Sequence, residues 1–290
     1  MKTLFLSLCL LVGAAFLYAQ DKPLNIIVLG AHPDDCEADA GGLAALYAKM
    51  GHNVKFVSVT NGDAGHYAMG GGVLAKIRME ESQKAAEILG VKEYVVMDNH
   101  DGELMPTLEI RKDIIREIRL WNADLVIGPR PHDYHPDHRY TSLLMQDAAF
   151  MVVVPNIAPD VPALKKNPVF IYAEDRFQKP YPFEADIAID IDEVFMQKIA
   201  GMGAHDSQHF DWLPWLSGTL DQVPEGEADK LASLAKRRPS SPGPSTRASL
   251  ISWYGEKGKS VKHAEGFEIC EYGKQPDKEE ILRLFPMLPR

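Results

Sequence analysis

Two short segments of the sequence place histidine beside aspartate at close spacing. They read GAHPDDCE and PHDYHPDH, and their side chains of interest are His32, Asp34, Asp35, His135, Asp137 and His138. Imidazole nitrogen and carboxylate oxygen suit a divalent ion such as zinc, and three protein ligands with one open position suit catalysis better than a structural role. Either segment alone is more typical of a turn or a helix cap, but the two together predict a catalytic metal centre.

The elements that must position these segments are strands of one sheet. Strand-like runs alternate with helical patterns up to Phe150, and the strand-like runs are NIIVL, VKFVSVT, YVVM and DLVIG. This alternation predicts parallel strands with right-handed crossovers, and runs that are apolar on both faces indicate a sheet with helices on each side. The predicted fold is therefore an α/β, Rossmann-like three-layer sandwich with a mostly parallel sheet.

In an open parallel sheet, reactive groups collect beyond the carboxyl ends of the strands. A polar segment follows each of the four strand-like runs, namely GAHPDDCE, NGDAGH, DNHDGE and PRPHDYHPDH. We therefore expect four polar loops to converge on one rim of the sheet.

The chain after Phe150 follows the alternation less closely. VFIYA and ADIAIDI indicate further strands and DEVFMQKIAGM a helix, while the Ser/Pro-rich segment 236–247 is typical of a mobile loop. We expect one domain over 20–290 with a C-terminal elaboration.

The N-terminus has the pattern of an export signal. Lys2 precedes an apolar run from Leu4 to Tyr18, and Ala19 precedes the polar QDKP. We expect a signal peptide over 1–19 and an exported protein, periplasmic or secreted, without a membrane span after cleavage; an uncleaved anchor is the alternative.

Composition narrows the class of partner. The formal net charge of −10 argues against a nucleic-acid partner and favours a small polar substrate. After signal cleavage Cys36 and Cys270 remain, which is too few for a disulfide framework. Whether they pair is left open, and for Cys36 we favour a buried packing role.

A family resemblance extends this interpretation. The segment AHPDDCEADAGGLAALYAKMGHNVKFVSVTNGDAGH resembles the opening of the PIG-L/LmbE-like family of metal-dependent N-deacetylases. IRMEESQKAAEILGV and RPHDYHPDHR resemble its later motifs, and AHDSQ and HAEGF its C-terminal signatures. The resemblance implies an LmbE-like fold. Relatives deacetylate N-acetylglucosamine joined to inositol, inositol phospholipid or malate, and often form homo-oligomers.

The resemblance also implies a role for each residue of the two segments. The metal ligands would be His32, Asp35 and His138. Asp34 would act as the general base, and a protonated His135 would steady the oxyanion. Asp137 would orient His135.

Substrate contacts are expected on the other loops. The resemblance places Arg78 and Asp101 where sugar-contacting residues are expected. Asn61 and Asp63 could bind sugar hydroxyls, although Asn-Gly-Asp is also ordinary turn chemistry. His205 and Glu265 lie in the C-terminal signatures without an assigned role.

The resemblance thus implies a zinc-dependent hydrolase that removes an N-acetyl group from an amino sugar or its conjugate; another divalent ion such as Fe2+ is an alternative metal. Two other functions remain open. One is a metal-dependent phosphoesterase, which two ions about 3.5 to 4 Å apart would favour. The other is a non-catalytic sugar-binding module on the same fold.

Overall fold

The computed structural model describes residues 22–290. The predicted signal peptide over 1–19 lies outside the described residues. Within 22–290, no helix is long and apolar enough to cross a membrane.

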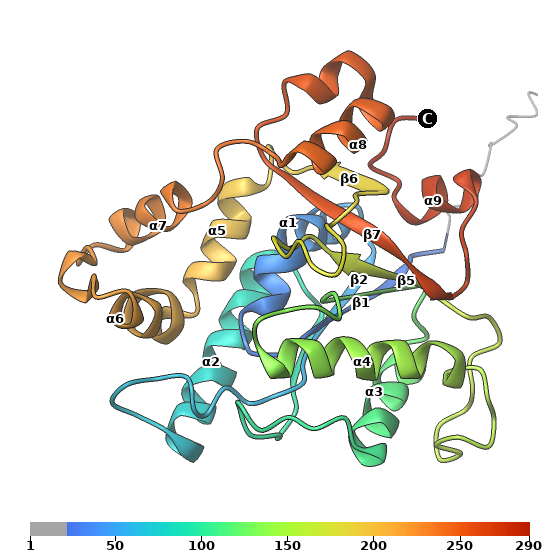
Figure 1. Ribbon diagram of the computed structural model, residues 1–290, viewed down its shortest axis with the longest axis horizontal. Helices are drawn as coiled ribbons and strands as arrows, with labels where there is room; N and C mark the ends of the chain where they lie inside the picture. The colour runs from blue at the N-terminus through green and yellow to red at the C-terminus, as the bar shows by residue number, and fades with distance from the viewer. Residues whose placement is uncertain (1–21) are drawn as a thin grey trace, which may run out of the picture.

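A seven-stranded sheet runs through the centre of the molecule (Figure 1). Its strands are β1 (Asn25–Gly30), β2 (Asn53–Ser58), β3 (Glu93–Val96), β4 (Leu125–Gly128), β5 (Val169–Ala173), β6 (Ile187–Asp190) and β7 (Ala264–Gly273). Their order is β3-β2-β1-β4-β5-β7-β6. The pairs from β3 to β5 are parallel, as predicted, and β7 is antiparallel to both β5 and β6.

Helices cover both faces of the sheet. They are α1 (Asp35–Lys49), α2 (Gly71–Leu89), α3 (Leu108–Leu120), α4 (Pro136–Met151), α5 (Phe195–Gly203), α6 (Leu213–Leu216), α7 (Glu227–Lys236), α8 (Pro244–Tyr254) and α9 (Lys278–Leu284). A π-helix, η1 (Ser207–Trp212), precedes α6, and η2 (Leu220–Gln222) and η3 (Gly255–Lys259) are 3-10 helices.

Strand β1 explains why three layers form. Ile26 and Val28 pack into a core cluster that includes residues of α1 and α9, whereas Ile27 and Leu29 pack into a second cluster with α3 and α4. Successive side chains of a strand point to opposite faces, so a strand that is apolar throughout must be covered on both. The predicted three-layer sandwich is confirmed.

Helix α1 carries a kink that a distant glutamate stabilises. Ala40 leaves helical geometry, with φ −142°, which frees the N–H groups that follow it. The Glu265 carboxylate accepts hydrogen bonds from Gly42 N at 2.8 Å and Leu43 N at 2.7 Å. A Cβ atom at Gly42 would lie 2.8 Å from Ile191, so this close approach requires glycine. Glu265, whose role the sequence left unassigned, therefore caps the second half of α1.

The C-terminal part differs from expectation in two respects. The loop predicted over 236–247 is shorter, because α7 ends at Lys236 and α8 begins at Pro244, whose fixed φ suits the first turn of a helix. Strand β7 and helices α7, α8 and α9 were also not predicted from the sequence.

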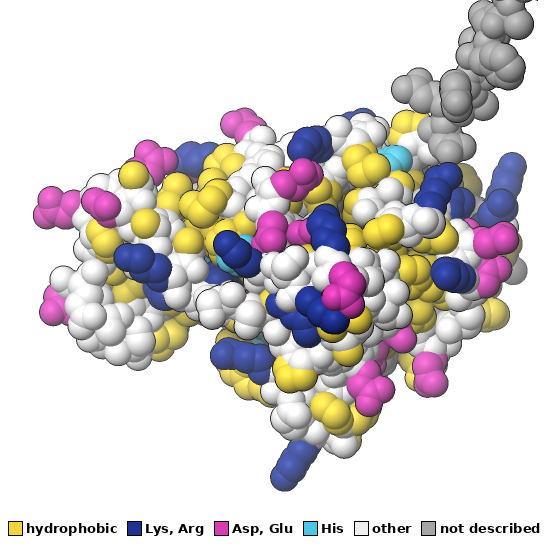
Figure 2. Space-filling view, turned by 90° about the horizontal axis from the view of Figure 1, so that it is seen from above, with side chains coloured by type: hydrophobic (Ala, Val, Ile, Leu, Met, Phe, Trp, Pro, Cys, Tyr) yellow, Lys and Arg dark blue, Asp and Glu magenta, His cyan; other side chains and the backbone are white. Residues whose placement is uncertain are grey.

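Cys36 and Cys270 are both buried and free. Cys36 is fully buried, which supports its predicted packing role. On the face seen in Figure 2, Lys and Arg side chains are interspersed with Asp and Glu and form no large patch of one sign.

Candidate metal centre and active site

The polar loops meet at the carboxyl edge of the sheet, as predicted. Strand β1 pairs with β2 on one side and with β4 on the other, so the strand order reverses at β1. Ligands in open α/β sheets bind at such a point. His32 and Asp35 follow β1, and His138 lies in the first turn of α4, after β4.

Three ligand atoms form a nearly regular triangle. His32 Nδ1 lies 3.2 Å from His138 Nε2, and Asp35 Oδ2 lies 3.4 Å from each of these nitrogens. Ligands at about 2.0 to 2.1 Å from a tetrahedral zinc ion are separated by about 3.3 Å. The predicted set of His32, Asp35 and His138 therefore fits one ion of this size.

Charge favours the ionised form of the carboxylate ligand. Burial alone would raise the pKa of Asp35, but His138 and His32 hold that pKa well below its usual range. An ionised carboxylate is the form that binds a metal.

Two carboxylates orient His32 from behind. Asp101 Oδ1 and Asp137 Oδ2 lie 3.1 and 3.2 Å from His32 Nε2, and despite burial these carboxylates hold the pKa of His32 well above its usual value. A metal-binding histidine characteristically donates its other N–H to a carboxylate, which leaves Nδ1 of His32 for the ion.

This arrangement corrects one sequence-based assignment and adds an unpredicted contact to another residue. The Asp137 carboxylate binds His32 and the amides of Gly102 and Leu104, and only the backbone N–H of Asp137 reaches His135. Asp101, expected as a sugar contact, likewise lies against His32. Helix α4 begins at Pro136, so the Asp137 side chain points across the rim toward the β1 loop.

Asp133 orients the ring of His138 in the same way, and this role was not predicted from the sequence. Its Oδ2 lies 3.1 Å from His138 Nδ1, and its Oδ1 accepts the His135 N–H at 2.7 Å. Although burial acts in the opposite direction, Asp35 and Asp133 raise the pKa of His138 to about 9. The only sequence signal for this role was that Asp133 precedes the ligand His138 by five residues.

The geometry favours one ion rather than two. Two groups of side chains could hold a metal, one with His32, His135 and His138 and one with His32, Asp101 and Asp137. Both depend on His32, whose neutral ring offers only one lone pair. A second ion on the Asp101 side would therefore compete with the first.

Asp34 is held beside the ligands without being one of the triangle. Its φ of 117° lies in the left-handed region, which is strained for a side chain with a Cβ. Although aspartate is a favoured N-cap, the Asp34 carboxylate caps no N–H of α1. Burial, and then the adjacent Asp35, raise the pKa of Asp34 to about 7. A carboxylate with such a pKa can exchange a proton near neutral pH.

His135 stands at the edge of the triangle. Its ring centroid lies 4.6 Å from that of His32 and 5.3 Å from that of His138. Burial and these two histidines lower the pKa of His135, which favours the neutral ring over the predicted protonated form. Because its Nδ1 accepts the Asp137 N–H at 3.2 Å, the proton of the neutral ring is assigned to Nε2, which remains a hydrogen-bond donor.

Arg78, which was predicted to contact the substrate, lies against the backbone of Gly65. Its Nη2 donates to the Gly65 carbonyl at 2.8 Å, and its buried Nε has no hydrogen-bond partner within the described chain. A Cβ at Gly65 would lie 3.1 Å from Asp101 Oδ2 and 3.7 Å from Trp212 Nε1. The lack of a side chain at Gly65 thus lets the chain approach Arg78 and Asp101 closely.

Asn61 and Asp63 serve the loops themselves. Asn61 donates to Asp98 at 3.0 Å and accepts from Asp63 N at 3.1 Å. Asp63 binds His100 at 2.7 Å and the Asp101 N–H at 3.1 Å. These contacts within the protein support the turn interpretation, while the substrate contact of Asn61 and Asp63 stays a prediction.

His205, also without a predicted role, belongs to a buried network under Asp34. Its Nε2 lies 3.0 Å from Glu37 Oε1, and Tyr94 donates to Glu37 Oε2 at 3.2 Å. The Tyr94 hydroxyl also accepts the Asp34 N–H at 3.4 Å. The network therefore supports the backbone of the strained Asp34.

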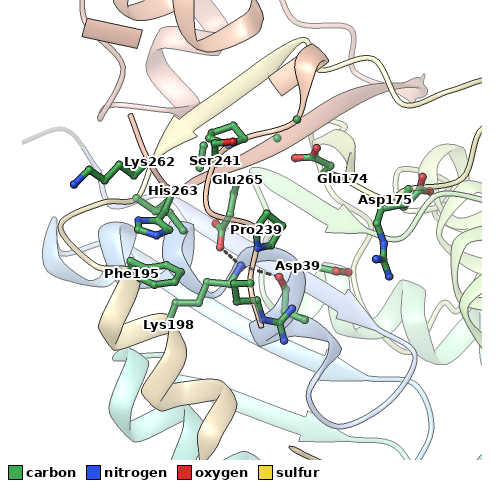
Figure 3. A pocket seen from close by; sticks show the side chains of 18 of the residues that line it. Asp39, Glu174, Asp175, Phe195, Lys198, Pro239, Ser241, Lys262, His263 and Glu265 are labelled. Atoms are coloured by element: carbon green, nitrogen blue, oxygen red, sulfur yellow. Dashed lines mark hydrogen bonds and ion pairs between the residues drawn. The ribbon is translucent and has the colours of Figure 1, made fainter. Parts of the chain in front are cut away.

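A cavity of about 390 Å³ opens beside the metal centre (Figure 3). It shares Asp39, Glu174 and Asp175 with a smaller cavity of about 100 Å³, which Asp35 and His138 line. Phe195 and His263 stack at one end of the larger cavity, and Lys198 reaches Glu265 across its floor.

Four further cations line this cavity, Arg176, Arg237, Arg238 and Lys262. The Nε of Arg238 is buried without a hydrogen-bond partner among the described residues. Burial lowers the pKa of Arg238, and Asp34 and Asp39 are the carboxylates that oppose this effect. Arg238 therefore brings positive charge from the segment after α7 toward the metal centre.

Comparison with known proteins places this geometry in a family. The family model described as PIG-L, GlcNAc-PI de-N-acetylase, matches residues 27–149. The diacetylchitobiose deacetylase of Thermococcus kodakarensis is 31% identical over 210 residues, which cover 68% of this chain and 78% of that protein. This chain belongs to the PIG-L family. The matched residues include the six side chains first singled out, His32, Asp34, Asp35, His135, Asp137 and His138.

A solved structure and a relative with another activity were also found. The N,N'-diacetylchitobiose deacetylase from Pyrococcus horikoshii, solved with its inhibitor MPG, is 25% identical, with a TM-score of 0.63 over 84% of this chain and 83% of that chain. The 4-oxalmesaconate hydratase of Pseudomonas putida is 27% identical over 198 residues, 65% of this chain and 75% of that protein. Named relatives of this PIG-L chain thus include deacetylases and a hydratase.

Proposed function

We propose that the protein is a zinc-dependent N-deacetylase that releases acetate from an N-acetylated amino sugar or its conjugate. One observation carries this proposal. The ligand atoms of His32, Asp35 and His138 are spaced for one tetrahedral ion, while Asp34 stays outside that set with a buried, partnerless Oδ1 among the described residues. The deacetylase relatives support the reaction class.

The proposed chemistry divides between the ion and two side chains. A divalent ion held by the three ligands supplies Lewis-acid chemistry, since it lowers the pKa of a water molecule from about 15.7 towards about 7. Asp34 accepts a proton from the water that attacks the amide carbon, and it returns a proton to the nitrogen when the C–N bond breaks. Neutral His135 donates from Nε2 to the oxygen on which negative charge develops.

The substrate would extend from the metal centre into the adjoining cavity. Arg238, Arg176 and Lys262 offer donors there, and the stacked rings of Phe195 and His263 offer an apolar surface. Sugar hydroxyls and an attached group can use both kinds of contact.

An acetate-release assay tests the proposal. The enzyme would be given N-acetylglucosamine, diacetylchitobiose and N-acetylated conjugates, with zinc, with a chelator, and as the Asp34→Asn variant. We expect release that the chelator abolishes and that Asp34→Asn lowers by about 10²-fold or more. Full activity after chelation or in the variant would falsify the mechanism. Turnover of 4-oxalmesaconate without any acetate release would favour a hydratase instead.

We further propose that the protein is exported after cleavage near residue 19. Support comes from the N-terminal pattern alone, Lys2 followed by an apolar run and Ala19. N-terminal sequencing of protein from the envelope or medium tests this, and an intact Met1 in the cytoplasmic fraction alone would reject it.

A further inference from the structure

His209 is a buried histidine that the proposed chemistry does not use. It lies in η1, a six-residue π-helix, and is 3% exposed. Its backbone N–H donates to the His205 carbonyl at 2.9 Å, and its carbonyl accepts from Arg237 at 3.2 Å. Short π-helices occur frequently at functional sites.

The start of η1 is fastened to α2, which fixes where His209 points. Ser207 donates to Glu81 twice, from its backbone N at 2.8 Å and from its hydroxyl at 2.7 Å. Glu81 is itself buried. These two hydrogen bonds hold η1 against α2, and they thereby set the position of the His209 ring.

The His209 ring faces the proposed general base. His209 Nε2 lies 3.8 Å from Asp34 Oδ2, about 0.8 Å beyond an ordinary hydrogen bond. Within residues 22–290, both His209 Nε2 and Asp34 Oδ1 are buried without a hydrogen-bond partner. Two such atoms on neighbouring side chains are unusual, because buried polar groups are normally paired.

Asp34 needs an external group to set its side chain. Its strained backbone turns the carboxylate away from the N–H groups of α1, and Tyr94 contacts only its backbone N–H. Burial, followed by His205 and the nearby arginines, keeps the pKa of His209 well below its usual value, so its ring carries a single N–H.

We propose that His209 is a positioning residue for Asp34: its Nε2–H donates to Asp34 Oδ2 and so directs Oδ1 toward the attacking water. This inference rests on the proposed function, because it assigns His209 a part in the same reaction. It requires a closure of less than about 1 Å between the two side chains, which is within ordinary side-chain adjustment.

Two substitutions of equal polarity separate this role from simple packing. His209→Gln places an amide nitrogen near the position of Nε2, whereas His209→Asn places one near Nδ1. We expect His209→Asn to lower kcat about 10- to 100-fold with KM within about twofold, and His209→Gln to recover most of that loss. His52→Gln, a histidine distant from the site, is the control and should leave both constants unchanged.

Metal content and melting temperature would be measured for each variant, so that misfolding is recognised. Equal losses in Gln and Asn, or a rise in KM at unchanged kcat, would overturn the proposal. If the wild type released no acetate, the proposed function would fail separately. Crystal structures of zinc-loaded wild type and His209→Asn then decide the inference: it requires Nε2 to Oδ2 within about 3.2 Å in the wild type and a displaced Asp34 carboxylate in the variant.

Discussion

The Asp133 carboxylate lies 3.1 Å from Nδ1 of the ligand His138, on the side of the ring opposite the triangle of ligand atoms. It fixes the ring so that Nε2 faces Asp35 and His32. Carboxylates in this position tune metal affinity without touching the metal.

We therefore expect Asp133→Asn to weaken zinc affinity by about 10- to 100-fold. The amide oxygen can still accept the His135 N–H, so the start of α4 should persist. Competition with a chromophoric chelator measures the affinity. Asp113→Asn on the exposed side of α3 is the control, and equal affinities in the two variants would reject the role of Asp133.

Zinc binding should release protons. In the metal-free protein the neighbouring carboxylates raise the pKa of His138 to about 9 and hold that of His32 well above its usual value, so both rings are charged at pH 7. Each must lose one proton to bind the ion, which predicts release of about two protons per zinc and an affinity that falls as the pH is lowered. Calorimetry in buffers of different ionisation enthalpy counts these protons. A proton count near zero at pH 7 would contradict the charged state of both rings.

Much of the architecture could be predicted from local patterns. NIIVL and DLVIG are apolar throughout, and only a strand covered on both faces explains such runs. Their alternation with helical patterns then determined the parallel order and brought His32, Asp35 and His138 to one rim. These predictions depend on periodicity and connection rules, which act along the chain.

The parts that were missed depend on contacts between distant segments. Glu265 caps α1 across more than 200 residues, and no local pattern relates the two. Likewise, which ring nitrogen a carboxylate reaches depends on how two loops fold against each other, so the contacts of Asp101 and Asp137 with His32 were not predicted. Strand β7 alternates polar and apolar residues after an irregular segment, and its antiparallel pairing breaks the preceding rule.

The Glu265 cap should be a large contributor to stability. Its carboxylate binds two N–H groups of α1 and lies 2.7 Å from Lys198, and both side chains are mostly buried. Glu265→Ala would leave the lysine charge buried without its partner, which lowers the free energy of unfolding by about 3 to 5 kcal/mol. Urea denaturation measures the change.

The exposed pair of Lys49 and Glu193 provides a matched control for Glu265. It joins the same residue types at 3.2 Å on the surface. Glu193→Ala should change the free energy of unfolding by less than about 1 kcal/mol. Similar losses in Glu265→Ala and Glu193→Ala would mean that neither burial nor the α1 kink makes the Glu265 cap special.

Arg238 should affect substrate binding more than the chemical step. It lines the cavity beside the metal centre, and its Nε has no partner within the described chain. If the substrate extends into that cavity, Arg238→Gln removes a charged donor in the ground state and the transition state alike. We expect KM to rise about 5- to 50-fold with kcat within about twofold.

A surface arginine serves as the comparison for Arg238. Arg116 on α3 pairs with Asp113 and Asp160 away from the cavity, so Arg116→Gln should leave KM unchanged. Steady-state kinetics on diacetylchitobiose and on an acidic N-acetylated conjugate would show whether the effect of Arg238→Gln depends on substrate charge. An unchanged KM for both substrates would mean that the substrate leaves the metal centre in another direction, toward Arg78 and Trp212. A fall in kcat alone would instead mean that Arg238 acts on the charge of Asp34. The charge of Asp34 already influences the pKa of Arg238.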